Sequence, residues 1–160
     1  MKRSICLFLS ILLTLSTLPF PTSAESYAET VLVSKTTEFL ADGSYVLIAI
    51  YENSVQTRSS TYKKYGSKAY TFYNASGEAL WKYTVDGVFT VNIGVSAVCT
   101  TSVHNYEIYN SNWSCSSANS YASGNQAISN GEFVKKLLGI TVERESFQVV
   151  LTCDSNGNLS

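Results

Sequence analysis

The strongest constraint on the fold of this chain is a two-residue periodicity over residues 81–92. The odd positions of this stretch are apolar or small, and they are Trp81, Tyr83, Val85, Gly87, Phe89 and Val91. The even positions are mostly polar, and they are Lys82, Thr84, Asp86, Val88, Thr90 and Asn92. Because successive side chains of a strand point to opposite faces, the pattern predicts a strand with one buried face.

Turn-forming residues divide the rest of the chain into further strands. Residues 74–77 (Asn-Ala-Ser-Gly) tolerate positive φ, which predicts a hairpin that joins an aromatic strand at 70–74 to the strand beginning at Trp81. The other predicted strands span residues 95–103, 106–109, 113–117, 118–122, 126–133 and 140–153.

Residues 130–139 fit two structures. Their capping residues and apolar spacing fit a short helix, but so short a helix is marginal alone, and the flanking strands favour a strand that ends in a tight turn at Leu138-Gly139. No long helical stripe appears elsewhere. The sequence therefore predicts an all-β fold, most simply a small antiparallel β-sandwich of about seven to nine strands.

The N-terminal part differs in charge from the remainder. Residues 31–40 and 45–51 flank a turn at 41–43 and predict an acidic N-terminal β-hairpin within residues 25–52. Residues 53–62 are polar and are expected to form an exposed connection to a β-sandwich domain at 63–160. The hairpin is expected to join the same sheet; the alternative is a removable element.

The first 24 residues predict export. Lys2 and Arg3 precede an apolar run at 6–15, and the small residues 22–24 offer a cleavage site before Glu25. We therefore expect residues 1–24 to be a cleaved signal peptide, the mature protein to be secreted, and no stable membrane span to remain in it. The chain has 11 basic and 12 acidic residues, and cleavage removes two basic ones. This mild acidity argues against nucleic acid and anionic lipid headgroups as partners.

Three cysteines follow the predicted signal peptide. A disulfide is expected outside the cell. Cys99 and Cys153 both continue alternating apolar sets and should point into one core, so the predicted pair is Cys99–Cys153. Cys115 is the rival partner for Cys99.

Several short motifs carry a family resemblance. Residues 76–81 (Ser-Gly-Glu-Ala-Leu-Trp) follow an aromatic strand, and residues 151–160 close the chain with Leu-Thr-Cys-Asp-Ser-Asn-Gly-Asn-Leu-Ser. Together with the turn at 42–45 and the stretch 138–140, they resemble an uncharacterised family of small secreted β-rich proteins of Gram-positive anaerobic bacteria. The resemblance implies export and a β-rich domain, and it carries no catalytic or binding residue onto this chain.

No residue pattern predicts catalysis or a metal site. His104 is the only histidine, and without a G-x-S-x-G motif it is expected at the rim of a strand rather than as a base. Glu143 and Glu145 share one strand face, whereas the acid pair of a glycosidase faces across a cleft. Residues 154–158 fit a turn better than a calcium loop, and the cysteine spacing does not fit zinc. We therefore predict a non-enzymatic protein without cofactor or metal.

Aromatic residues provide the remaining candidate site. The chain has 11 tyrosines, and they cannot all be deeply buried because buried hydroxyls need partners. Tyr106, Tyr109 and Trp113 lie close together in the sequence among asparagines, as in paratopes, which predicts a binding surface for an extracellular glycan or protein. The alternative function is a processed secreted toxin or antimicrobial protein whose N-terminal hairpin masks an aggregation- or membrane-prone strand.

Overall fold

The computed structural model describes residues 30–53 and 59–160, so the predicted signal peptide lies outside the described residues. The described chain forms eight strands and no helix. In order they are β1 (Thr30–Phe39), β2 (Tyr45–Asn53), β3 (Thr61–Tyr73), β4 (Ala79–Asn92), β5 (Ser96–Ile108), β6 (Trp113–Ser123), β7 (Gln126–Leu137) and β8 (Ile140–Thr152). Within this part of the chain, no helix is long and apolar enough to cross a bilayer.

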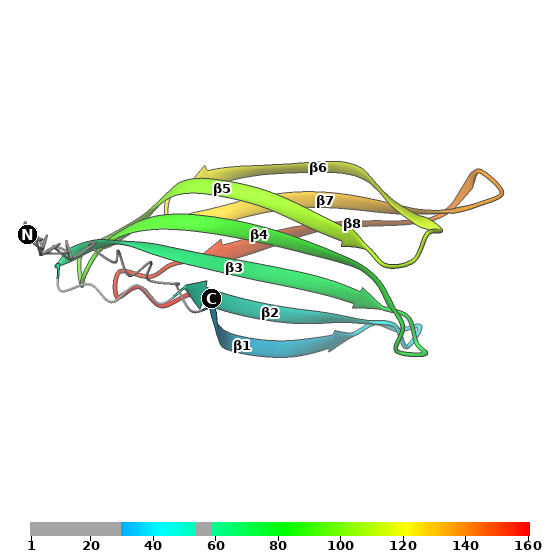
Figure 1. Ribbon diagram of the computed structural model, residues 1–160, viewed down its shortest axis with the longest axis horizontal. Coiled ribbons are helices and arrows are strands. Elements are labelled where there is room, and N and C mark those ends of the chain that lie inside the picture. Colours follow the sequence, from blue (N-terminus) through cyan, green and yellow to red (C-terminus); the bar gives the residue numbers. More distant parts are fainter. Residues whose placement is uncertain (1–29, 54–58) are drawn as a thin grey trace, which may run out of the picture.

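The strands form two antiparallel sheets, one with the order β1-β2-β3-β4-β5 and one with the order β6-β7-β8 (Figure 1). The smaller sheet packs over β3, β4 and β5, whereas β1 contacts only β2 among the described strands. The all-β sandwich predicted from the sequence is therefore confirmed. We call the face of the five-stranded sheet that points to the smaller sheet its inner face, and the opposite one its outer face.

An aromatic layer fills the space between the sheets. Trp81 of β4 stacks on Phe133 of β7 with 4.3 Å between ring centroids and on Phe147 of β8 at 5.0 Å. The odd positions of β4 from Trp81 to Val91 are buried, as the periodicity predicts, and so are Val149 and Leu151. Gly131 of β7 leaves room for the ring of its cross-strand partner Phe147 and for Tyr83 of the other sheet, because a Cβ there would be 2.7 Å from Phe147 Cζ and 3.2 Å from Tyr83 Cε2.

The buried hydroxyls of this layer have hydrogen-bond partners close by, whereas Trp81 Nε1 is buried with no hydrogen-bond partner among the described residues. The hydroxyl of Tyr83 lies next to Ser129 Oγ and donates to the carbonyl of Asn130 at 2.9 Å. Ser129 Oγ in turn donates to the carbonyl of Asn119 at 2.8 Å. These bonds allow a tyrosine and a serine to be fully buried without the cost of an unpaired hydroxyl.

Two strand breaks predicted from the sequence are absent. The chain from Ser96 to Ile108 is one strand, because the polar residues near His104 occupy exposed and rim positions of β5 rather than a turn. The predicted break after residue 117 is a register shift between Cys115 and Ser117 within β6. The strand interpretation of residues 130–139 is confirmed, with φ of 50° at Leu138 and 83° at Gly139 in the connecting turn.

The predicted Cys99–Cys153 disulfide is not formed in the structure. Both side chains are buried, as expected, but Cys99, Cys115 and Cys153 are free thiols. Each sulfur is oriented toward a nearby carbonyl instead: Cys99 Sγ donates to Thr101 O at 3.3 Å and Cys153 Sγ to Asp154 O at 3.6 Å. Cys115 Sγ, the rival partner, donates to Ser117 O at 3.4 Å.

The aromatic layer makes a stability prediction. Replacement Phe133→Ala removes a fully buried ring that stacks on Trp81, so it should lower the free energy of unfolding by roughly 3–5 kcal/mol in urea denaturation. The matched control is Phe39→Ala, whose side chain is 75% exposed and should change stability by no more than about 0.5 kcal/mol. Equal losses for the two variants would contradict the packing described above.

The free thiols make a reactivity prediction. Burial raises the pKa of Cys153 to about 11 and also raises the pKa of Cys99, so both remain protonated and shielded at pH 8. Burial also raises the pKa of Cys115, but this side chain is only partly buried and is therefore more accessible than the other two. Iodoacetamide should therefore modify Cys115 first in the native protein, and Cys99 and Cys153 only after denaturation, as followed by mass spectrometry of tryptic peptides. Equally fast labelling of Cys153, or a disulfide mass, would be the contrary result.

Candidate functional site

The outer face of the five-stranded sheet is hollowed near its middle. Ala49 of β2 and Ala69 of β3 lie directly opposite each other, and Thr84 of β4 continues the row. These short side chains leave a depression because longer side chains of the same face border them on either side. The alanines themselves are 5% and 4% exposed, since the bordering side chains cover them.

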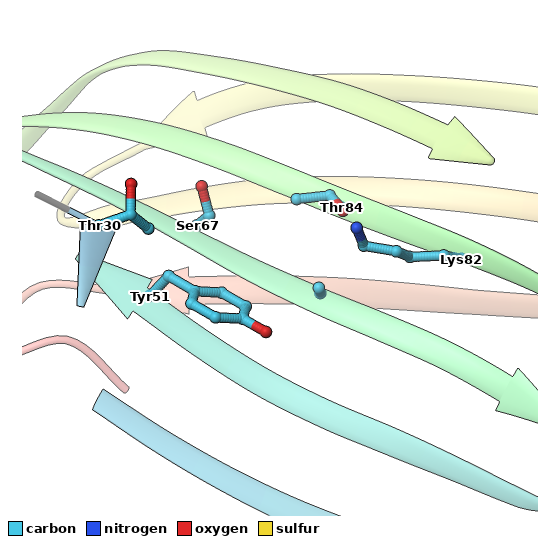
Figure 2. Close-up of a pocket in the computed structure, with 6 residues that line it drawn as sticks. Thr30, Tyr51, Ser67, Lys82 and Thr84 are labelled. Carbon is cyan, nitrogen blue, oxygen red and sulfur yellow. The ribbon is translucent and has the colours of Figure 1, made fainter. Parts of the chain in front are cut away.

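Two adjoining hollows form this depression. The first has a volume of about 230 Å³ and is lined by Thr30, Tyr51, Ser67, Ala69, Lys82 and Thr84 (Figure 2). The second, of about 170 Å³, is lined by Asn53, Tyr65, Gly66, Ser67, Asp86, Gly87, Val88, Thr101 and Val103. Because Ser67 belongs to both, we treat the two hollows as one site and call it the outer groove.

The polar groups of the outer groove are partly used and partly free. Ser67 Oγ donates a hydrogen bond to Asp86 Oδ1, and Thr30 Oγ1 donates to Asn53 Oδ1 at 2.9 Å. The hydroxyls of Tyr51 and Tyr65 make no hydrogen bond with any described residue. Two aromatic rings, whose hydroxyls have no partner among residues 30–53 and 59–160, therefore border a site whose serine and carboxylate are hydrogen-bonded to each other.

A charged network adjoins the outer groove at Lys82. The Lys82 Nζ lies 3.1 Å from Glu107 Oε1, and the Tyr109 hydroxyl donates to Glu107 Oε2 at 2.8 Å. The hydrogen bond from Tyr109, followed by that from Lys82, holds the pKa of Glu107 below its usual value. Burial, followed by the bond to Glu107, raises the pKa of Tyr109 to about 12. The positive charge of Lys82 is thus balanced by its neighbour.

The three residues predicted as a binding surface do not come together. Trp113 is 3% exposed and packs in the core against Phe72 at 6.1 Å, so the prediction that it binds a ligand at the surface is wrong. Tyr106 is on the inner face, edge-on to Phe133 at 6.0 Å. Tyr109 is exposed and belongs to the network beside the outer groove. The three residues are close in the sequence but do not share one face, because successive side chains of a strand point in opposite directions.

The other candidates from the sequence lie elsewhere. His104 is partly buried on the inner side of β5, with Nδ1 3.2 Å from Ser120 Oγ. Glu143 pairs with Lys135 at 3.1 Å. Glu145 is partly buried opposite Phe133, and burial, followed by the charge of Glu143, raises its pKa.

The C-terminal segment that has calcium-loop character forms a closed turn. Asp154 Oδ1 accepts hydrogen bonds from the backbone N–H groups of Asn156 and Asn158, and Oδ2 accepts one from the Asn158 side chain. No cluster of three or more potential metal ligands occurs within residues 30–53 and 59–160.

The sequence pattern predicted the exposed face of some residues that line the outer groove. Lys82, Thr84 and Asp86 are even positions of the β4 alternation and were expected on its exposed face. The sequence did not predict that Tyr51 and Tyr65 share a face with these residues, because the shared face depends on the register of β2 with β3 and of β3 with β4. Register is set by the whole sheet rather than by the local sequence.

Comparisons with protein-family models, with curated proteins and with solved structures give no match for this chain.

The network beside the outer groove can be tested through the pKa of Glu107. Replacement Tyr109→Phe removes the hydrogen bond that favours ionised Glu107, so the pKa of Glu107 should rise toward its usual value, as measured by NMR titration of its carboxyl carbon. In the parent, the lowered pKa of Glu107 stabilises the fold at pH values above the pKa that Glu107 has in the unfolded chain. The variant should therefore be less stable than the parent at neutral pH and equally stable at low pH. The control is Tyr121→Phe on β6, which should leave Glu107 unchanged.

Proposed function

We propose that this protein is an exported, non-enzymatic binding module that holds a neutral glycan in the outer groove. The observation that carries the proposal is the pair of adjoining hollows bordered by Tyr51 and Tyr65, whose hydroxyls are free among the described residues. Export is proposed from the pattern of residues 1–24.

The chemistry of a sugar fits these side chains. A pyranose ring presents C–H groups on its faces and hydroxyls at its edges, and an aromatic ring with a polar tip complements both. Thr84 and Asn53 add short polar groups that can donate or accept hydrogen bonds. A glycan rather than an apolar ligand is favoured, because the lining mixes hydroxyl, amide and charged groups throughout.

The charge balance favours a neutral sugar. The charged residues that line the outer groove are Lys82 and Asp86, one of each sign, so no single sign dominates. Lys82 is paired with Glu107, and Asp86 accepts a hydrogen bond from Ser67. These bonds also occupy the two carboxylates, which supports a binding role over acid–base catalysis.

The placement of the outer groove supports preorganised binding. Its lining residues come mainly from β3 and β4, which are paired with strands on both sides. Side chains on central strands lose little freedom when a ligand binds, which lowers the entropic cost of association. This rigidity favours the binding module over the alternative of a processed toxin, since β2, part of the hairpin proposed as a removable mask, pairs with β3 along nine positions and contributes to the outer groove.

The experiment is a screen of neutral plant, fungal and bacterial oligosaccharides on an array, followed by calorimetry with the best ligand. Replacement Tyr51→Ala should weaken binding about ten-fold or more, because an aromatic contact and a hydroxyl are lost together. Tyr51→Phe should have a smaller effect that isolates the hydroxyl.

Two matched variants control for nonspecific effects. Tyr106→Ala and Tyr121→Ala each remove a tyrosine that is nearly half exposed outside the outer groove, and both should bind as the parent does. An array without any retained neutral glycan, or equal losses for Tyr106→Ala and Tyr51→Ala, would refute the assignment of this site.

A further inference from the structure

The β7–β8 hairpin ends in an exposed apolar tip. Leu137 is 51% exposed, Leu138 is 101%, Ile140 is 68% and Val142 is 52%. We call residues 137–142 the apolar finger. In Figure 1 this turn projects beyond the neighbouring strand ends at one end of the sandwich. Exposed apolar side chains gathered in one place mark an interaction site more often than scattered ones do.

The finger extends beyond the rest of its sheet. The register of β6 with β7 reaches only Lys135, where Trp113 is the partner. From Lys136 onward the hairpin consists of two strands, with Lys136 paired to Thr141 and Leu137 to Ile140. No described strand therefore covers these apolar side chains.

The backbone at the apex is unfavourable for the residue that occupies it. Leu138 has φ of 50°, and it is the one residue other than glycine with positive φ in the described part of the chain. A two-residue turn of this kind favours asparagine or glycine, which accept the left-handed region readily. A leucine held there with no contact to the core points to a role for the side chain itself.

The distribution of side chains indicates what surrounds the finger. Leu137 and Ile140 form one pair on the hairpin, Leu138 occupies the apex, and Val142 follows a register shift near the base. A tip only two strands wide, with exposed aliphatic side chains at its apex and along its length, can be surrounded by a fluid apolar medium.

The charges at the base indicate which surface provides that medium. Lys135 is paired with Glu143, and Arg144 with Glu132, while Lys136 has no ion-pair partner among the described residues. One uncompensated lysine next to an apolar tip can reach a lipid phosphate while its neighbours enter the acyl region. The balanced charge otherwise fits a zwitterionic surface better than a strongly anionic one.

We propose that the apolar finger inserts into the interface of a zwitterionic lipid bilayer, with Leu138 deepest and Lys136 at the level of the phosphates. The protein is then held at the membrane surface by one hairpin tip and does not span it. The finger belongs to the three-stranded sheet and the outer groove to the five-stranded one. The two sites are therefore independent, and this inference stands whether or not a glycan binds.

Depth of insertion is tested first. Replacement Leu138→Trp places a fluorophore at the apex, while Trp81 and Trp113 are 2% and 3% exposed and give a constant background. With vesicles of phosphatidylcholine brominated in the acyl chains, the added tryptophan should shift to shorter wavelength and be quenched. The control is Val95→Trp in the β4–β5 turn at the opposite end of the sandwich (Figure 1), which should not be quenched.

Affinity is tested by flotation with phosphatidylcholine vesicles. Replacement Leu138→Asn should weaken binding about ten-fold through the lost apolar burial. It should not impair folding, because asparagine tolerates the positive φ of this position. Val95→Asn removes another exposed apolar side chain, 72% exposed, and should bind as the parent does. All variants carry the same N-terminal residues, so any lipid binding by residues 6–15 is common to them.

Three results would overturn the proposal: no flotation of the parent protein, equal flotation of Leu138→Asn, or an unquenched tryptophan at position 138. Sedimentation without lipid tests the main alternative, in which the finger makes a contact between proteins. A dimer that is lost in Leu138→Asn, together with no flotation, would assign the finger to a contact between proteins instead.

Discussion

Side-chain packing between the sheets is the interaction on which the rest of the structure depends. In the described part of the chain, no strand of the five-stranded sheet pairs through backbone hydrogen bonds with a strand of the three-stranded sheet. The two layers are joined mainly through aromatic rings, with Trp81 stacked on Phe133 and Phe147 and Phe72 stacked on Trp81 at 5.1 Å. Each sheet is built from hairpins between strands that are neighbours in the sequence. Burial of the aromatic rings drives the association of the two sheets.

The same packing positions the outer groove. Because Trp81, Tyr83 and Val85 are held against the smaller sheet, the alternating side chains of β4 must point away from it. The groove is thus formed by the reverse side of the best-packed strand. Its first hollow is lined by Ala69, whose small side chain lies among longer ones. The lining of the groove, with its tyrosine borders, therefore comes mainly from paired strands and not from loops.

The unequal sizes of the sheets explain what remains exposed. Three strands cover only β3, β4 and β5, so β1 is exposed along its whole length. At the other extreme, β7 and β8 extend past β6 and end in the apolar finger. The outer groove and the finger lie on different sheets, and the fold therefore presents two chemically distinct surfaces: one polar and aromatic, the other a narrow aliphatic tip.

The sequence by itself determined the local features: the buried phase of β4, the hairpin turn at 74–77, and the turn at Leu138-Gly139. These depend on side-chain alternation and on the φ preferences of a few residues, which are local properties. The sequence also indicated that Lys82, Thr84 and Asp86 face solvent. Only the tertiary structure decided that Trp113 is buried while Tyr51 and Tyr65 border a groove, and that Cys99 and Cys153 face separate carbonyls. The reason is that register and the covering of one sheet by another join residues far apart in the chain, and no local pattern specifies those pairings.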